Sequence, residues 1–274
     1  MTRIAASLVV LALVAGCGGG DRANDILSET AANLGKIRSG DLTLRLVVSP
    51  REGTKGRVGF ELRGPFALRP GRLPVAKVAY TQIAGAREAT ATFISTGTKA
   101  YAELNGKAYE LPPASAEIVR RAAAGIGGSG GLDSFDIRSW VEDPAVMEGG
   151  VVGGAMTEHV SADLDVVAAA NGLLRLLRGL GRDAPTIEGA EAERLRDAVE
   201  SSSFDVWSGR DDRVLRRLLL NATLGFDVPD SLRRALGDVV GAKVAFELAI
   251  EDPNEPVSVS PPANPLPSSQ LPSG

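Results

Sequence analysis

Strict alternation of apolar and polar residues marks two segments, one near each end of the chain. Residues 42–49 place leucine or valine at every second position, and residues 243–250 repeat the pattern with Val244, Phe246, Leu248 and Ile250. Successive side chains of a β-strand point to opposite faces of a sheet, so both segments are predicted to be half-buried strands. A sheet with one apolar face needs a second layer to cover it.

Further strands and several helices are predicted between these two segments. Asn105-Gly106 joins two short apolar runs and is typical of a tight hairpin turn. The other predicted strands are 57–63, 75–83, 88–96, 98–104, 107–111, one or two within 145–163, 204–207, 213–224 and 256–260. Helical spacing is found at 21–38, 114–124, 134–142, 165–180, 187–201 and, as a short piece, 230–236.

This order of elements predicts an α+β protein. About ten or eleven strands are interrupted mid-chain by helices, which favours an antiparallel sheet with the helices packed on its concave face. A closed barrel would need little helix, so we expect an open, curved half-barrel.

The N-terminus has the pattern of a secretory signal peptide over residues 1–16. Arg3 precedes an apolar run from Ile4 to Ala15, which is shorter than the ~20 residues that span a bilayer. The run ends in Val14-Ala15-Gly16-Cys17, like a bacterial lipobox, in which the cysteine becomes a diacylglyceryl cysteine bearing acyl chains such as palmitate. Cys17 is the only cysteine of the chain, although an ordinary signal peptide with an incidental cysteine is the alternative. Residues 17–23 are then a flexible tether, and the protein is exported and lipid-anchored on the outer face of the bacterial cell membrane.

Composition excludes several classes of function. A formal net charge of −4 leaves no basic excess to neutralise a phosphate backbone, so nucleic acid is not an expected partner. One cysteine and one histidine exclude a disulfide framework and a Cys/His zinc cluster. No metal and no cofactor are therefore expected.

Catalytic residues are not predicted, and we expect no enzyme. His159 lies beside Glu158, but neighbouring strand residues face opposite sides of a sheet. The pair Asp211-Asp212 lies in a predicted hairpin turn, where aspartate serves the turn geometry. The glycine run at 125–131 lacks the Lys-Ser/Thr ending of a phosphate loop and is taken as a connection, with a mobile lid as the alternative. Arg175, Arg178 and Arg182 form a solvated helix face or meet an anionic head group.

Taken together, these features resemble the LppX/LprAFG lipoproteins, which have a LolA-like fold. The likeness is carried by 101–109, 157–165, 204–216 and 246–262, and as an order of elements it covers most of 24–262. The glycine run at 125–131 and the helix at 187–201 depart from the family pattern. The resemblance implies a lipid-binding half-barrel over residues 24–262 that holds an acylated lipid or glycolipid and carries or places it in the cell envelope. It also implies an envelope transport protein as a further partner.

The residues of such a cavity would be apolar and would face inward from the sheet and the central helix. The candidates are Leu44, Leu46, Phe60, Leu62, Tyr80, Phe93, Tyr101, Leu173, Leu174, Leu177, Phe246 and Leu248. The same residues could instead fill a solid core, which would favour a non-transporting sensor or scaffold of the same fold that acts through protein–protein contact. The Pro- and Ser-rich tail at 263–274 is predicted to be disordered.

Overall fold

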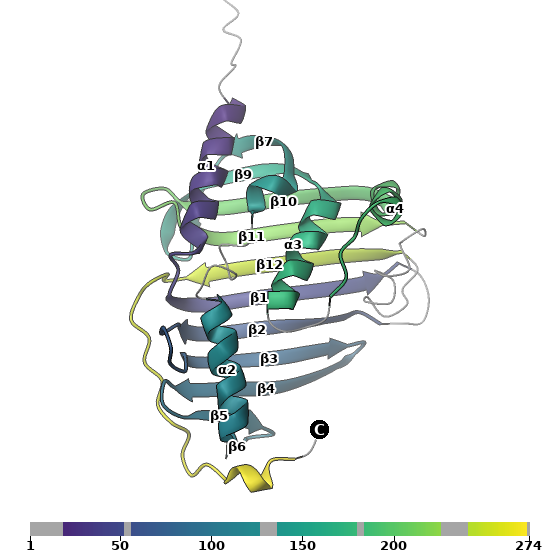
Figure 1. Cartoon of the computed structure of the whole chain (residues 1–274). Coiled ribbons are helices and arrows are strands. Elements are labelled where there is room, and N and C mark those ends of the chain that lie inside the picture. The colour runs from purple at the N-terminus through teal and green to yellow at the C-terminus, as the bar shows by residue number, and fades with distance from the viewer. Residues whose placement is uncertain (1–18, 52–55, 127–135, 180–183, 226–240, 273–274) are drawn as a thin grey trace, which may run out of the picture.

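The fold is an open antiparallel sheet with helices on one face. The structure is a computed structural model that describes residues 19–51, 56–126, 136–179, 184–225 and 241–272. Within these ranges twelve strands form one curved sheet, and four α-helices lie on the same side of it (Figure 1). The predicted fold class is confirmed, with one strand more than the upper predicted number.

The strands and helices follow the predicted order closely. The strands are β1 (Ser39–Pro50), β2 (Val58–Ala67), β3 (Val75–Ala84), β4 (Arg87–Thr96), β5 (Ala100–Leu104), β6 (Lys107–Glu110), β7 (Val141–Met147), β8 (Val151–Val152), β9 (Ala155–Leu164), β10 (Val199–Gly209), β11 (Leu215–Leu224) and β12 (Ala242–Glu251). The helices are α1 (Gly19–Leu34), α2 (Pro113–Ile126), α3 (Val166–Gly179) and α4 (Ala190–Ala198), with 3-10 turns η2 (Ile137–Trp140) and η3 (Ser268–Gln270).

The two segments with strict alternation pair with each other at the centre of the sheet. The strand order is β6-β5-β4-β3-β2-β1-β12-β11-β10-β9-β7, with β8 paired to β9. Leu44 lies opposite Leu248 and Leu46 opposite Phe246, so the apolar faces of β1 and β12 coincide. Strands β1 to β6 extend to one side of this pair as consecutive hairpins, and β11 to β7 extend to the other. The edge strands β6 and β7 do not pair, so the sheet stays open.

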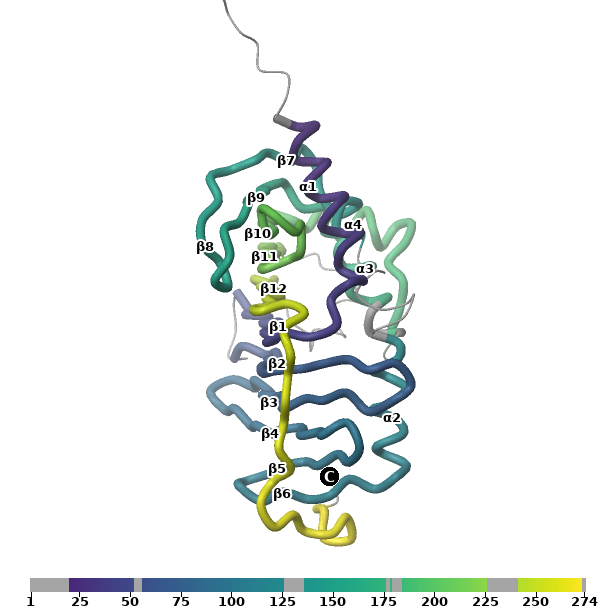
Figure 2. The backbone as a smooth tube through the Cα atoms, turned by 90° about the vertical axis from the view of Figure 1, so that its left-hand side faces the viewer, coloured from purple at the N-terminus to yellow at the C-terminus, as the bar shows by residue number. Residues whose placement is uncertain are grey.

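The core lies between the helices and the half of the sheet that runs from β7 to β1. Helix α1 contributes Ala23, Ile26, Leu27 and Leu34, and Ile37 follows directly after the helix, all at most 1% exposed. They join Trp140 of η2 and apolar residues of β9 to β12 in one cluster. Figure 2 shows the helices on one side of the sheet and the β8 hairpin on the other. The early helix is therefore part of the domain core.

Several predicted boundaries differ from the structure. Where a helix was predicted at 134–142, the described residues form the 3-10 turn Ile137–Trp140, and Val141 and Glu142 begin strand β7. Helix α1 begins at Gly19, within the range 17–23 predicted as a flexible tether. Val199, Glu200 and Ser201 begin β10 instead of ending a helix, because pairing with β11 outweighs their helical spacing. The predicted strand at 256–260 is wrong, since this proline-containing segment joins no ladder. The short helical piece predicted at 230–236 and most of the 125–131 glycine run lie outside the described residues.

The C-terminal tail is docked against the sheet, although a disordered tail was predicted. After β12, Asn254 donates its backbone N–H to Ser39 O at 2.9 Å, and the chain then runs along the strand ends towards β6 (Figure 1). There Leu266 accepts from Glu110 N and donates to Ala108 O, each at 2.8 Å. Proline removes donors but does not prevent such a contact, because Leu266 retains its own N–H and C=O. The tail thus covers the free edge of β6.

Candidate functional site

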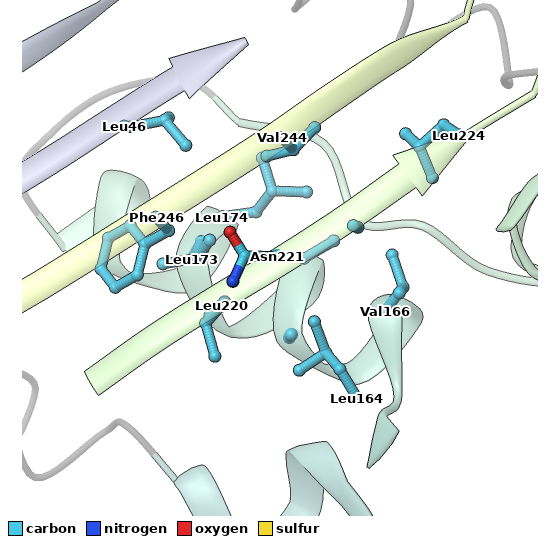
Figure 3. A pocket seen from close by; sticks show the side chains of 13 residues that line it. Leu46, Leu164, Val166, Leu173, Leu174, Leu220, Asn221, Leu224, Val244 and Phe246 are labelled. Carbon is cyan, nitrogen blue, oxygen red and sulfur yellow. The ribbon is translucent and has the colours of Figure 1, made fainter. Parts of the chain in front are cut away.

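An apolar cavity of about 220 Å³ lies between α3 and the centre of the sheet. Figure 3 shows side chains of α3 and of β1, β11 and β12 around it. All but one of its lining residues are apolar, and the polar one, Asn221, donates its side-chain amide to Ser203 Oγ at 3.3 Å. The lining residues are Leu46, Leu164, Val166, Ala169, Ala170, Leu173, Leu174, Leu220, Asn221, Ala222, Leu224, Val244 and Phe246.

Small residues account for the space. Ala169 and Ala170 on α3 face the sheet where Ala222 lies on β11, so three alanines line a site that leucines would fill. Elsewhere under the helices, Phe204, Leu215 and Leu218 are at most 1% exposed and belong to the core cluster. The space between the sheet and the helices is therefore filled by packed side chains under α1, whereas part of it is empty under α3.

Side-chain hydrogen bonds support α3 at its first turn and in its middle. Asp165 caps its N-terminus, where Oδ1 accepts from the backbone N–H groups of Val167 at 3.0 Å and Ala168 at 2.9 Å. The side chain of Asn171 pairs with the backbone of Ile187, donating to its O and accepting from its N at 2.9 Å each. The cap stabilises the first turn of α3, and the contacts of Asn171 join the helix to the segment that precedes α4.

A second hollow of about 180 Å³, with charged residues in its wall, adjoins the cavity at the N-terminus of α3. Leu164 and Val166 line both spaces. The hollow adds Glu142, Asp165 and Arg196, so charged groups lie next to the apolar wall. The combined site has an apolar interior and a polar border.

The structure brings four of the predicted cavity residues together. Leu46, Phe246, Leu173 and Leu174 all line the cavity. Leu44 and Leu248 lie one pair further along β1 and β12 and pack in the core cluster instead. Along β12 the cavity therefore lies at Phe246 and Val244, and the Leu44–Leu248 pair lies outside it.

The predicted residues of the β2–β5 region lie apart from this cavity. Phe60 and Leu62 are half-buried on β2, and Phe60 stacks on Tyr80, which is 42% exposed, with ring centroids 6.3 Å apart. Phe93 pairs with Ala102, whereas Tyr101 pairs with Ile94, so Phe93 and Tyr101 lie on opposite faces of the sheet. The prediction that Tyr101 faces the cavity is therefore wrong. In β5 it is Ala102, and not Tyr101, that shares a face of the sheet with Phe93.

Two predicted residues are not described in side-chain detail. Leu177 lies on α3, but its side chain falls outside the described residues, and so does all of Cys17. The sequence analysis missed most of the cavity wall, in particular the alanines of α3 and β11. Alternating and helical patterns identify an inward-facing residue. They do not show whether the side chain opposite it, on another element, is large enough to fill the space between them.

The polar residues that the sequence analysis considered and set aside as catalytic groups make contacts within the fold. His159 Nε2 lies 2.9 Å from Asp205 Oδ1, and its ring stacks on Trp207. Asp212 accepts from Arg216 Nη2 at 2.7 Å and from Val214 N at 3.0 Å. Burial alone would raise the pKa of Asp212, but these hydrogen bonds outweigh burial and hold that pKa below its usual value. Arg178, in the last turn of α3, donates from Nη1 to Thr186 Oγ1 at 2.9 Å and so joins the end of the helix to the segment before α4.

Among the residues that the structure describes, no cluster of three or more His, Cys, Asp or Glu side chains could hold a metal ion. Within the same ranges, every helix is too short or too polar to cross a membrane.

Comparison with known proteins shows similarity to solved structures only. No family model and no curated sequence matches the chain. LprF from Mycobacterium bovis has 15% identity over 90% of this chain and 100% of its own, with a TM-score of 0.44. The Mycobacterium tuberculosis lipoprotein LppX has 13% identity over 88% of this chain and 99% of its own, with a TM-score of 0.39. In a Pseudomonas aeruginosa MucA/MucB complex the match has 13% identity over 82% of this chain and 55% of that chain, with a TM-score of 0.26.

Proposed function

We propose that this protein is a lipid-anchored protein of the bacterial envelope that binds an acyl chain in the cavity beneath α3. The cavity carries the proposal, because its wall is apolar except at Asn221. Apolar cavities of ~150 Å³ stay dry and bind small apolar ligands. A space of about 220 Å³ in such a wall favours hydrocarbon over water.

The size of the cavity limits the ligand. Pockets that enclose whole drug-sized ligands measure roughly 300–1,000 Å³, so the described cavity suits part of one acyl chain. Each buried methylene contributes about 0.8 kcal/mol, and several of them suffice for measurable binding. The adjoining charged hollow provides a place for a polar head group outside the apolar wall. Binding and transfer of lipid, without covalent chemistry, is the activity we propose.

Native mass spectrometry of residues 17–274 tests lipid binding. We expect lipid to co-purify with the wild type and to be lost in Ala170→Phe, because the added ring occupies the cavity. Arg175→Phe is the matched control, since it adds the same ring to the exposed side of α3. Absence of lipid from the wild type, together with strong destabilisation by Ala170→Phe, would favour the filled-core scaffold that acts through protein contact.

Membrane anchoring is tested separately. Cys17→Ala removes the thiol that would be acylated and leaves the apolar export segment intact. We expect this variant to leave the membrane fraction, and the wild type to carry the mass of a diacylglyceryl group. A variant that stays membrane-bound, with no such mass on the wild type, would show that Cys17 is not an anchor.

A further inference from the structure

A charged hollow of about 390 Å³ lies on the face of the sheet opposite the helices. The central strands β1, β2, β11 and β12 form its floor, and the turn of the β8 hairpin lies over one end of it. At that end a β-carbon on Gly153 would lie 3.4 Å from Cγ of Glu251, in van der Waals contact. Figure 2 shows the β8 hairpin on this outer side of the sheet. We call this space the outer hollow, and its lining residues are Thr43, Arg45, Glu61, Arg63, Val152, Gly153, Arg216, Arg217, Glu247, Ala249 and Glu251.

Two short side chains at the centre of the sheet make room for the outer hollow. Ala249 of β12 lies opposite Thr43 of β1. On the next strands, Arg217 of β11 lies opposite Ala249, and Arg63 of β2 lies opposite Thr43. The four residues thus form one row across the outer face, with the short side chains between the long ones. The two arginines are three strand spacings apart, or about 14 Å, so an anion above the short side chains would have a guanidinium group on either side.

A β-bulge brings a further arginine to the outer hollow. The pairing of β10 with β11 shifts its register between Trp207 and Ser208, which leaves Arg216 as an extra residue in β11. Arg216 and Arg217 therefore both line the hollow, although neighbouring residues of a regular strand face opposite sides. The side chain of Arg216 is 8% exposed and donates from Nη2 to Asp212 Oδ2 at 2.7 Å. Its Nε is buried without a hydrogen-bond partner among the described residues.

Arg217 is held in position by its neighbours. Its Nε and Nη2 lie 2.9 Å and 2.8 Å from Glu247 Oε1, and its guanidinium group lies over the ring of Trp207, 5.7 Å from the centroid. Trp207 in turn stacks on His159, with ring centroids 4.3 Å apart. The contact with Glu247 uses only part of the five N–H donors of the guanidinium group, so Nη1 retains donors for a ligand. A side chain that is already ordered loses little conformational entropy on binding.

The lining of the outer hollow contains four arginines and three glutamates, so it has one more positive charge than negative. Glu61 pairs with Arg45 at 3.6 Å, and Glu247 pairs with Arg217, so two of the glutamates have their charge neutralised within the hollow. Arg63 is exposed and forms no ion pair in the part of the chain that the structure describes. Its charge is therefore available to an anion.

We propose that the outer hollow binds the phosphate group of a small hydrophilic compound. Guanidinium groups bind phosphate through paired N–H donors, and Arg63 and Arg217 provide such donors from opposite sides. Glu251, which makes no ion pair among the described residues, lies under the hairpin turn and accepts hydroxyl groups of the same compound. The volume lies within the roughly 300–1,000 Å³ that encloses small ligands, and the charged wall disfavours hydrocarbon. Because the apolar cavity lies on the other face of the sheet, this site does not depend on the lipid binding of the proposed function.

Isothermal titration calorimetry of residues 17–274 with glucose 6-phosphate tests the site. We expect saturable binding of one molecule per chain and no binding of glucose, because the phosphate group provides the interaction. Arg63→Gln should weaken binding at least about tenfold, since it removes a charged hydrogen-bond donor. Arg87→Gln is the matched control, because Arg87 is an exposed arginine on β4 outside the hollow, and this variant should bind like the wild type. Absence of saturable binding to the wild type, or equal weakening by the two variants, would overturn the proposal.

A second variant fills the outer hollow without removing a charge. Ala249→Leu enlarges a side chain on its floor and should abolish binding of glucose 6-phosphate while the protein remains folded. Unchanged binding in this variant would show that the phosphate binds elsewhere and would overturn the proposal. Vesicles of phosphatidylglycerol, added as a competitor to the wild type, distinguish the source of the phosphate. Displacement of glucose 6-phosphate by the vesicles supports the site with a lipid head group as ligand, and lack of displacement supports it with a free phosphorylated compound.

Discussion

Gly172 of α3 lies so close to Trp140 that the indole ring takes the place of a side chain. A β-carbon at Gly172 would lie 2.7 Å from Cε2 of the ring and 2.9 Å from Nε1, closer than real side chains approach. Trp140 is fully buried and belongs to the core cluster that also contains α1 residues. The two residues therefore fix α3 to the core beside the cavity.

Gly172→Ala should destabilise the protein by about 1–3 kcal/mol, because the added methyl group overpacks the contact with Trp140. The measurement is chemical denaturation followed by tryptophan fluorescence. Gly20→Ala is the matched control, since Gly20 lies in α1 with open space around it and should gain up to about 1 kcal/mol. Equal effects of the two changes would show that the Gly172 contact is not tight.

Glu158→Gln should lower the free energy of unfolding by about 2 kcal/mol, the scale of a hydrogen bond to a charged group. Glu158 is 7% exposed and pairs with both Arg22 and Arg213, so it joins α1 to β9 and to the β10–β11 turn. Thermal unfolding measures the change. Glu117→Gln is the control, because that carboxylate forms an exposed pair with Arg120 on α2 and should leave the melting temperature unchanged.

Truncation after Pro262 should release the edge of β6 with only a small loss of stability. It removes the two backbone hydrogen bonds of Leu266, each of which contributes about 0.5–1.5 kcal/mol. Hydrogen exchange should become faster at the Glu110 amide, which donates to Leu266 O. Truncation after Gln270 keeps Leu266 and should leave that amide protected. Slow exchange at Glu110 in the shorter chain would contradict the docked tail.

Asp212→Asn should reduce stability at neutral pH and lose its effect in acid. The pKa of Asp212 is lower in the folded protein than its usual value of 3.8. The charged form therefore stabilises the fold above that value, and the contribution disappears as the pH falls through the lowered pKa. Urea unfolding of both proteins between neutral pH and pH 3 measures the difference. A difference that stays constant down to the lowest pH would contradict the role of the Asp212 charge.

The sequence predicted most of the fold because its patterns are local. Alternation in β1 and β12, the Asn105-Gly106 turn and the helical spacing of α3 depend on neighbouring residues, and all three are confirmed. What depends on distant partners was missed. Tyr101 has its face decided by register with β4, and Val199 joins β10 through its pairing with β11.

The cavity was predictable only in small part, for a similar reason. Leu46, Leu173, Leu174 and Phe246 are found where inward-facing residues were expected. The space itself arises where the alanines of α3 and β11 line the same site, and these are brought together only by the packing of α3 on the sheet. A sequence shows which side chains are small but not which of them meet.

The pairing of β1 with β12 also sets the order in which the chain can fold. Strands β1 to β6 are consecutive hairpins and can form as soon as residues 39–110 are available. The other half of the sheet joins them only through β12, which begins at Ala242. Contacts so distant in sequence make folding slow, because a long loop must close before they form. Until the last strand arrives, β1 exposes an unpaired edge, so a nascent or exported chain would need protection by a chaperone through almost its whole length.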